Sequence, residues 1–430
     1  MDHQNPGGSP GATASSRARL GSVEALLEKK GDPMARSAVA AKVAADMKSA
    51  SFIREMFERG RRMKAQRGDD HVFDFSLGNP NGVPPEQFFA AVRAVAAERQ
   101  PGLHRYMPNA GFDECRAAVA SFLSREYRLP IDAKSVVMTS GAAGGCNAVL
   151  RAVCDPGDEV ILLAPYFPEY RFYTEQANAR PVVVQTNDAF QPDLEAIAAA
   201  ITPRTRAVLI NTPNNPSGAV FDAAACRGLA ELLSRHDRPD QPVYLVCDDP
   251  YRRIIYDLDW CPTPVHHYPR SIIVSSYSKD LSIAGERAGY IALPPALPER
   301  DVVLGALTML NRTLGFVNMS AFMQRVIARC ADALCDVEFY RGNRDLLCKA
   351  LLEYGYELIV PRGALYAFPR TPIPDDVDFI DRLANHGILA VPGLGFGRPG
   401  YMRLSFCVDR GTIERSLPAF RAAIGEVRSR

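Results

Sequence analysis

The sequence predicts an α/β fold: a three-layer α/β/α large domain with a mainly parallel seven-stranded sheet, plus a smaller α+β domain built from both chain ends. Three observations predict it. The chain has 430 residues, about three times the ~150-residue prior for one domain. Short apolar runs alternate with longer amphipathic stretches, as in parallel sheets covered on both faces. From about residue 318 the pattern changes to helices followed by short strands.

Seven apolar runs are the expected strands of the large sheet. They are Val136–Met138, Glu159–Leu163, Val182–Val184, Ala207–Ile210, Val243–Cys247, Ile272–Val274 and Tyr290–Leu293. Helix-like stretches between them include Ala143–Cys154, Leu194–Ile201 and Ala223–Arg235. In such sheets the ligand crevice lies beyond the carboxyl ends of the strands. The residues just after each run are therefore the candidate site.

The two chain ends supply the remaining parts. Residues 1–45 are expected to be an N-terminal extension, disordered over the Gly-, Pro- and Ser-rich first 20 residues or partly helical. A helical pattern runs from Val23 to about Arg67, and residues 46–80 are expected to join the small domain. Residues 81–317 form the large domain and 318–430 the small one. Strands are expected at Asp74–Leu77, Glu357–Val360, Leu365–Phe368, Ile388–Val391 and Met402–Phe406, with helices through Tyr354 and over Ile413–Val427.

Composition excludes several classes of function. Fifty Lys and Arg against 49 Asp and Glu give a net charge of +1, which argues against a nucleic-acid partner bound through a large positive charge. No apolar run approaches the ~18 residues that span a bilayer. The ten cysteines form no Cys-x-x-Cys pair and have no histidine at ligand spacing, so no metal site is expected. We expect a reducing, cytoplasmic setting.

Two strand ends predict a binding surface for a flat, phosphorylated ligand. Thr139–Gly145 is small and glycine-rich and leads into a helix. Backbone N–H groups there can approach an anion, although an ordinary strand-to-helix turn explains the composition equally well. Phe167 stands between Tyr166 and Pro168, where an aromatic ring is either a stacking platform or part of the core.

Three further strand ends carry polar chemistry. Asn211–Gly218 is either a plain turn-rich loop or a source of rigidly placed amides. Asp248 closes an apolar run and is either a helix cap or the partner of a cation. Lys279 follows another apolar run, and burial near cations such as Arg287 would lower its pKa toward that of a nucleophilic amine. Each feature is weak by itself, but all of them lie at one sheet edge.

These residues resemble the class I/II aminotransferases, the pyridoxal-phosphate enzymes of fold type I, over roughly residues 50–425. The signature Ser276-x-Ser278-Lys279 … Gly285-x-Arg287 carries the resemblance. It implies that Lys279 forms a Schiff base with pyridoxal 5'-phosphate and later moves the substrate proton. It further implies that Asp248 pairs with the ring nitrogen.

The resemblance assigns the remaining site residues. Asn215 and Tyr251 would bond the ring oxygen, and Phe167 would stack on the ring. Gly78 would border the substrate, and Arg403 would grip its α-carboxylate, which suits a planar guanidinium. Tyr106 would reach a phosphate in the neighbouring subunit of a homodimer with shared active sites. The phosphate itself would be held by the backbone of Ala142 and Ala143, by the hydroxyls of Ser276 and Ser278, and by Arg287.

The implied reaction is transfer of an amino group from an L-amino acid to a 2-oxo acid. A different pyridoxal-phosphate reaction on the same scaffold is the alternative: C–S lyase, cyclopropane-forming elimination, decarboxylation or oxidation. A ligand-sensing transcription regulator is a third possibility, but residues 1–50 are too short for the DNA-binding unit it needs. For a second substrate carboxylate, Arg105, Arg171, Arg312 and Arg398 are candidate partners.

Overall fold

The computed structural model describes residues 38–48 and 52–428. Its contacts divide the chain into one unit over Met1–Arg54 and a second over Glu55–Arg430. Helix α2 (Ala41–Lys48) and the start of α3 (Phe52–Arg67) are the described parts of the first unit. The expected disorder of residues 1–20 and the start of the helical pattern at Val23 lie outside the described residues.

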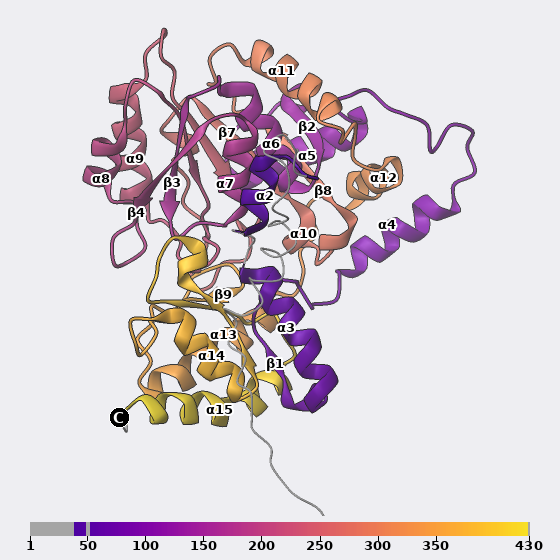
Figure 1. Ribbon diagram of the computed structural model, residues 1–430. Helices are drawn as coiled ribbons and strands as arrows, with labels where there is room; N and C mark the ends of the chain where they lie inside the picture. Colours follow the sequence, from indigo (N-terminus) through magenta and orange to yellow (C-terminus); the bar gives the residue numbers. More distant parts are fainter. Residues whose placement is uncertain (1–37, 49–51, 429–430) are drawn as a thin grey trace, which may run out of the picture. The chain divides into compact units, whose positions relative to one another are not determined.

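A seven-stranded sheet forms the centre of the second unit (Figure 1). Its order is β2-β8-β7-β6-β5-β3-β4, and only β8 runs antiparallel to its neighbours. The predicted fold class and the mainly parallel sheet are confirmed. The strands are β2 (Val136–Ser140), β3 (Glu159–Ala164), β4 (Arg180–Gln185), β5 (Thr205–Ile210), β6 (Tyr244–Asp248), β7 (Ser271–Ser276) and β8 (Ala288–Ala292).

Helices cover both faces of this sheet. Alternate residues of each strand enter two separate clusters: Met138, for example, packs with one set of helices and Val137 with the other. The first face is covered by α4 (Glu86–Ala97), α5 (Asp113–Glu126), α8 (Leu194–Ala200), α9 (Ala223–His236) and α12 (Ala321–Cys330). The second is covered by α6 (Gly141–Val153), α7 (Glu169–Gln176) and α11 (Arg300–Thr313).

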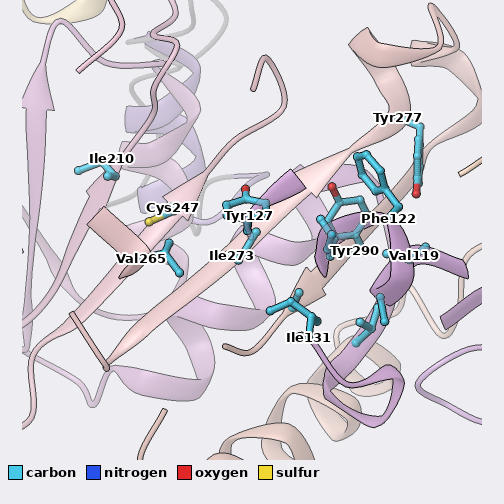
Figure 2. Packing of buried hydrophobic residues seen from close by; sticks show 14 of the residues in the cluster. Val119, Phe122, Tyr127, Ile131, Ile210, Cys247, Val265, Ile273, Tyr277 and Tyr290 are labelled. Atoms are coloured by element: carbon cyan, nitrogen blue, oxygen red, sulfur yellow. The ribbon is translucent and has the colours of Figure 1, made fainter. Parts of the chain in front are cut away.

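Figure 2 shows part of the first cluster, in which strand residues such as Ile273 and Tyr290 meet helix residues such as Phe122. The rings of Tyr277 and Tyr290 lie 5.7 Å apart in an edge-to-face contact. Because Tyr277 opens the short helix α10 (Tyr277–Asp280), this buried contact fixes the segment that carries Lys279. Burial of this kind contributes about 25 cal/mol per Å² of apolar surface.

Segments from both ends of the second unit form two smaller sheets. β1 (Phe73–Asp74) pairs in parallel with β10 (Ile388–Leu389), and Arg59 pairs with Asp381 at 2.5 Å. A three-stranded sheet has the order β11-β12-β9. Its strands are β9 (Tyr366–Ala367), β11 (Val391–Pro392) and β12 (Met402–Ser405), and the nearby helices are α13 (Val337–Tyr354), α14 (Asp376–Asn385) and α15 (Arg410–Arg428).

Some expected elements differ. No strand forms over Glu357–Val360, because Ile359 and Val360 are exposed and pair with no neighbouring strand among the described residues. β1 is shorter than the expected Asp74–Leu77. Helix α12 packs against α4 and α5, although it lies beyond the expected boundary at residue 317. The division into domains remains a prediction. The short 3-10 helices are Asp69–His71, Ala133–Ser135, Pro264–His266, Ala284–Glu286 and Gly393–Phe396.

Candidate active site

The carboxyl ends of the sheet strands gather the polar side chains. Asp248 closes β6, and Ser276 closes the neighbouring β7 directly before the turn of Lys279. β2 ends at Ser140, opposite Ala288 at the start of antiparallel β8. The same sheet edge therefore carries the glycine-rich helix start, the carboxylate and the lysine, as expected for this class of sheet.

Lys279 is a buried amine. Its Nζ donates a hydrogen bond to the Gly78 carbonyl oxygen at 2.6 Å and lies 5.7 Å from the centre of the Tyr251 ring. Burial, opposed by Cys407 and assisted by the nearby cations Arg403 and Arg287, lowers the pKa of Lys279 to about 8. A larger fraction of this amine is therefore neutral near pH 7 than for an ordinary lysine, which makes it a usable nucleophile and base.

Asp248 is a buried carboxylate with one free oxygen. Its Oδ2 accepts a hydrogen bond from the Tyr170 hydroxyl at 2.5 Å. Its Oδ1 is buried and has no hydrogen-bond donor among the described residues. Burial raises the pKa of Asp248 to about 7, although the bond from Tyr170 works in the opposite direction. A buried oxygen without a donor is costly, so this site fits a ligand that brings a proton or a cation.

The start of α6 forms a close-packed cradle. Gly141 has a φ of +69°, and a Cβ atom there would lie 2.6 Å from the Arg287 guanidinium. A Cβ at Gly289 would lie 2.9 Å from the backbone nitrogen of Ala142. Only glycine therefore lets β8 and Arg287 approach the first amides of this 13-residue helix. A guanidinium beside the free N–H groups of a helix N-terminus suits an anion.

Arg403 is a buried cation on β12. It donates hydrogen bonds to Asn215 Oδ1 at 3.0 Å and to the Ser76 carbonyl at 2.6 Å. Its Nε has no partner in the part of the chain that the structure describes, and burial lowers the pKa of the guanidinium. Its guanidinium carbon lies 4.7 Å from the centre of the Tyr366 ring. A planar cation with an unused donor suits a carboxylate ligand.

Hydrogen bonds fix the residues between the carboxylate and the guanidinium. The Asn215 backbone N–H donates to Asn211 Oδ1 at 2.7 Å, and Asn211 donates to the Asp248 carbonyl at 2.7 Å. The hydroxyls of Tyr251 and Tyr366 lie 2.9 Å apart. A side chain at Gly78 would overlap the Tyr366 hydroxyl, so the close approach of this backbone requires glycine.

Sequence reasoning missed Tyr170, Tyr366 and Ser76. Tyr170 lies three residues after Phe167, and the two rings meet edge-to-face with centroids 5.5 Å apart. Its position three residues after Phe167, in the first turn of α7, could have revealed the tyrosine. Nothing local could have indicated the other two, because their contacts to Tyr251 and Arg403 cross 115 and 327 residues of sequence.

The remaining expected residues differ in exposure. Ser276 and Ser278 are buried at the start of α10, and Phe167 is half-buried. Tyr106 is 87% exposed in the single chain and so contacts little of it. Of the candidate second cations, Arg398 bonds Asp188 at 3.1 Å and Arg171 bonds Glu175 at 2.9 Å. Arg105 and Arg312 are exposed.

The fold and this site have the features of one class of protein: a sheet edge that carries a buried lysine amine with a lowered pKa, a buried carboxylate and a glycine-lined helix start, with a buried guanidinium nearby. No group of three or more His, Cys, Asp or Glu side chains among the described residues could hold a metal ion. Within the same residues, no helix has the length and apolar character needed to cross a membrane.

Comparisons with known proteins give the family. The model of aminotransferase class I and II matches residues 70–420, so the chain belongs to that family and is a transaminase. It is 33% identical over 374 residues to a probable aspartate/prephenate aminotransferase of Thermus aquaticus, covering 85% of this chain and 94% of the relative. It is 31% identical over 371 residues to the aspartate/prephenate aminotransferase of Thermus thermophilus, covering 85% and 94%.

Solved structures agree. An aminotransferase from Eubacterium rectale superposes with a TM-score of 0.87 at 35% identity, covering 91% of this chain and 99% of the other. Aspartate aminotransferase from Thermus thermophilus with maleate superposes with a TM-score of 0.80 at 28% identity, covering 90% and 100%. These relatives do not favour a lyase, decarboxylase or oxidase on the same scaffold.

Proposed function

We propose that the chain is a pyridoxal 5'-phosphate-dependent aminotransferase that moves an amino group from an L-amino acid to a 2-oxo acid by a ping-pong mechanism. The observation that carries this proposal is the placement of Lys279, with its lowered pKa, at the same sheet edge as Asp248, whose Oδ1 has no donor within residues 38–48 and 52–428. When bound, the cofactor supplies an aldehyde for the amine and a cationic ring that accepts electrons from the substrate's α-carbon.

The residues present fit this group. Asp248 offers a buried oxygen for a protonated ring nitrogen, and the glycine-lined start of α6 offers N–H groups beside Arg287 for a phosphate. We assign phosphate binding to Ala142 and Ala143 through their backbone, to Ser276 and Ser278 through their hydroxyls, and to Arg287. Phe167 would stack on the ring, and Asn215 and Tyr251 would bond its phenolic oxygen.

The residues of the chain then divide the chemistry. Lys279 would hold the aldehyde of the cofactor through its amine, and the same amine would move a proton from the donor's α-carbon as a general base. Asp248 stays ionised while it faces a cation, because an opposite charge nearby favours the carboxylate form. Arg403 holds the donor's α-carboxylate beside the Gly78 backbone, which orients the α-hydrogen.

The names of the relatives support testing acidic substrates first. The Thermus relatives are named for aspartate and prephenate, and the Thermus thermophilus structure is described as containing maleate, a dicarboxylate. Arg398 and Arg171 already pair with carboxylates of this chain. We therefore propose Arg105 and Arg312, both exposed in the single chain, as the stronger candidates for a second substrate carboxylate.

A homodimer with shared active sites is part of the proposal. Large apolar side chains are exposed in the single chain, and a second copy would cover such surface. They include Val83 (75% exposed), Val302, Met309, Leu314 and Val317. Tyr106 would reach the phosphate of the partner subunit. All ten cysteines are free and buried, which supports a reducing, cytoplasmic location.

A half-reaction tests the proposal. Purified protein is loaded with pyridoxal 5'-phosphate and mixed with L-aspartate, L-glutamate or an apolar amino acid, without any 2-oxo acid. We expect the absorbance of the cofactor's aldehyde form to change to that of its amine form, with one amino donor consumed per cofactor. Adding 2-oxoglutarate or pyruvate should then restore the absorbance of the aldehyde form. Release of ammonia or carbon dioxide instead would support the alternative reaction, and failure to bind the cofactor would refute the assignment.

A further inference from the structure

A cluster of five charged side chains lies next to the residues assigned to the reaction. This ion cluster consists of the buried Asp249, Arg252 and Asp280 and the half-buried Glu126 and Arg253. Arg252 Nε lies 3.1 Å from Glu126 Oε1, and Arg253 Nε lies 4.0 Å from Glu126 Oε2. Arg253 Nη1 lies 3.7 Å from Asp280 Oδ2. Glu126, the last residue of α5, is thus shared by both arginines.

The two aspartates directly follow the two central residues of the reaction. Asp249 comes after Asp248, and Asp280 comes after Lys279. Both aspartates are buried, and Asp249 Oδ2 accepts a hydrogen bond from the Tyr127 hydroxyl at 2.7 Å. The cluster therefore includes the residue next to Asp248 and the residue next to Lys279.

Arg253 has the contacts that connect the segment after Asp248 with the turn that carries Lys279. It lies two residues after Tyr251, on the turn that follows Asp248. Its Nη1 and Nη2 donate to the carbonyls of Ala333 and Asp332, each at 2.9 Å. The same loop then holds the Lys279 turn, because the Cys335 backbone N–H donates to the Asp280 carbonyl at 2.6 Å.

The Lys279 turn needs such support. Helix α10 has only four residues, and a single helical turn is unfavourable without tertiary contacts. Arg252 is held rigidly on the other side of the cluster. Its guanidinium lies 4.0 Å from the centre of the Tyr127 ring and 5.2 Å from that of Trp260, and it donates to the Cys261 carbonyl at 2.9 Å.

We propose that Arg253 is a positioning residue: its fork joins Asp280 and the Ala333 loop to the turn after Asp248, and so fixes Lys279 relative to Asp248. This inference rests on the proposed function. The cluster holds three carboxyl groups against two guanidiniums, so removing Arg253 takes away the ion-pair partner of the buried Asp280 directly beside the lysine turn. Burial raises the pKa of Asp280 to about 7 and that of Asp249 to about 6, with the arginines opposing the rise.

The test separates positioning from stability. Arg253→Met removes the fork but leaves Asp280 unpaired, and Arg253→Met with Asp280→Asn also removes that charge. Arg253→Lys keeps the charge and loses the fork. Arg125→Met is the matched control, because Arg125 forms an exposed pair with Asp332 at 3.1 Å in the same region. Each protein is loaded with pyridoxal 5'-phosphate, and thermal midpoint, cofactor affinity, kcat, donor KM and the pH midpoint of the holoenzyme's visible absorbance are measured.

We expect the double variant to recover the thermal midpoint and cofactor affinity of the unchanged protein. Its kcat should nevertheless stay at least 20-fold lower, with donor KM changed less than threefold and the absorbance midpoint shifted by half a pH unit or more. Arg253→Lys should fall between the two, and Arg125→Met should match the unchanged protein. Full recovery of kcat and of the absorbance midpoint in the double variant would overturn the positioning role. If the unchanged protein binds no cofactor, the proposed function fails instead.

Discussion

Two carboxylates at opposite edges of the same sheet behave differently. Glu159 begins β3, accepts a hydrogen bond from Thr202 at 2.8 Å and pairs with Arg180. Burial alone would raise its pKa, but these partners lower it below the ordinary value. Asp248 ends β6, and its Oδ1 has no donor in the part of the chain that the structure describes; burial raises its pKa to about 7. Side chains of the chain satisfy the amino-end carboxylate, whereas the carboxyl-end carboxylate keeps one oxygen for the ligand that we propose.

The same contrast holds for the cations. At the amino end, Arg206 donates to the carbonyls of Val153 and Pro242, at 2.6 and 3.1 Å. Facing the carboxyl end from β12 of the three-stranded sheet, Arg403 bonds Asn215 in the loop after β5 and keeps its Nε without a partner among the described residues. A fold does not bury unsatisfied charge without a compensating gain. The unsatisfied edge is therefore where binding and chemistry are expected, and substitutions there should affect turnover more than those at the other edge.

The largest effect is expected for Lys279→Ala. This change removes both the covalent attachment and the general base, so turnover should fall by about 10⁴-fold or more, since general acid–base catalysis alone contributes about 10²–10⁴. Steady-state transamination measures the loss, and borohydride trapping followed by peptide mass spectrometry should show the cofactor attached at residue 279 only in the unchanged protein. Turnover above a trace in the variant would refute the role of Lys279.

Arg403→Lys should come next. Loss of the planar fork should lower kcat/KM for the donor by about 10- to 100-fold, the equivalent of one charged hydrogen bond of about 1.5–3 kcal/mol, mainly through KM. The matched control is Arg206→Lys at the amino edge, which should leave KM unchanged. If both substitutions changed the donor KM equally, the unpaired Nε of Arg403 would have no special role in binding the donor.

Tyr170→Phe should have a moderate effect. The lost hydroxyl favours the ionised form of Asp248, so its removal should raise the pKa of Asp248 further and lower kcat by about tenfold, within the range for a hydrogen bond to a charged group. The pH profile of kcat should move to higher pH on its acidic limb. Tyr173→Phe, on the same helix, is the control and should leave that limb unchanged.

The smallest effect concerns stability in the cofactor-free protein. Asp280 has a folded-state pKa of about 7 against the ordinary 3.8. The folded state therefore binds more protons between about pH 4 and 7, and the free energy of unfolding falls as pH rises through that window. Asp280→Asn should flatten this slope by up to about 1.4 kcal/mol per pH unit. Urea unfolding at several pH values measures it, with the exposed Asp332→Asn as control. An unchanged slope would mean that Asp280 is ionised throughout.

Much of the fold follows from local pattern. The seven apolar runs became the seven strands of the sheet, with ends shifted by one or two residues, because a strand buried on both faces must be continuously apolar. Expectation failed at Glu357–Val360, where an apolar stretch stays exposed without a partner strand. A strand needs a neighbour to pair its backbone, and the sequence of one segment does not contain that information.

The sequence alone also determined the types of residue at the sheet edge, since Asp248 closes β6, Lys279 lies in the turn after β7 and α6 begins directly after β2. Only the tertiary structure decided which long-range partners they have: the Tyr170 hydroxyl on Asp248, the Gly78 carbonyl on Lys279, and Glu126 between two arginines. The reason is physical. Strand and helix formation depends on neighbours along the chain, whereas burial, hydrogen bonding and charge pairing are set by residues that meet only when the chain has folded.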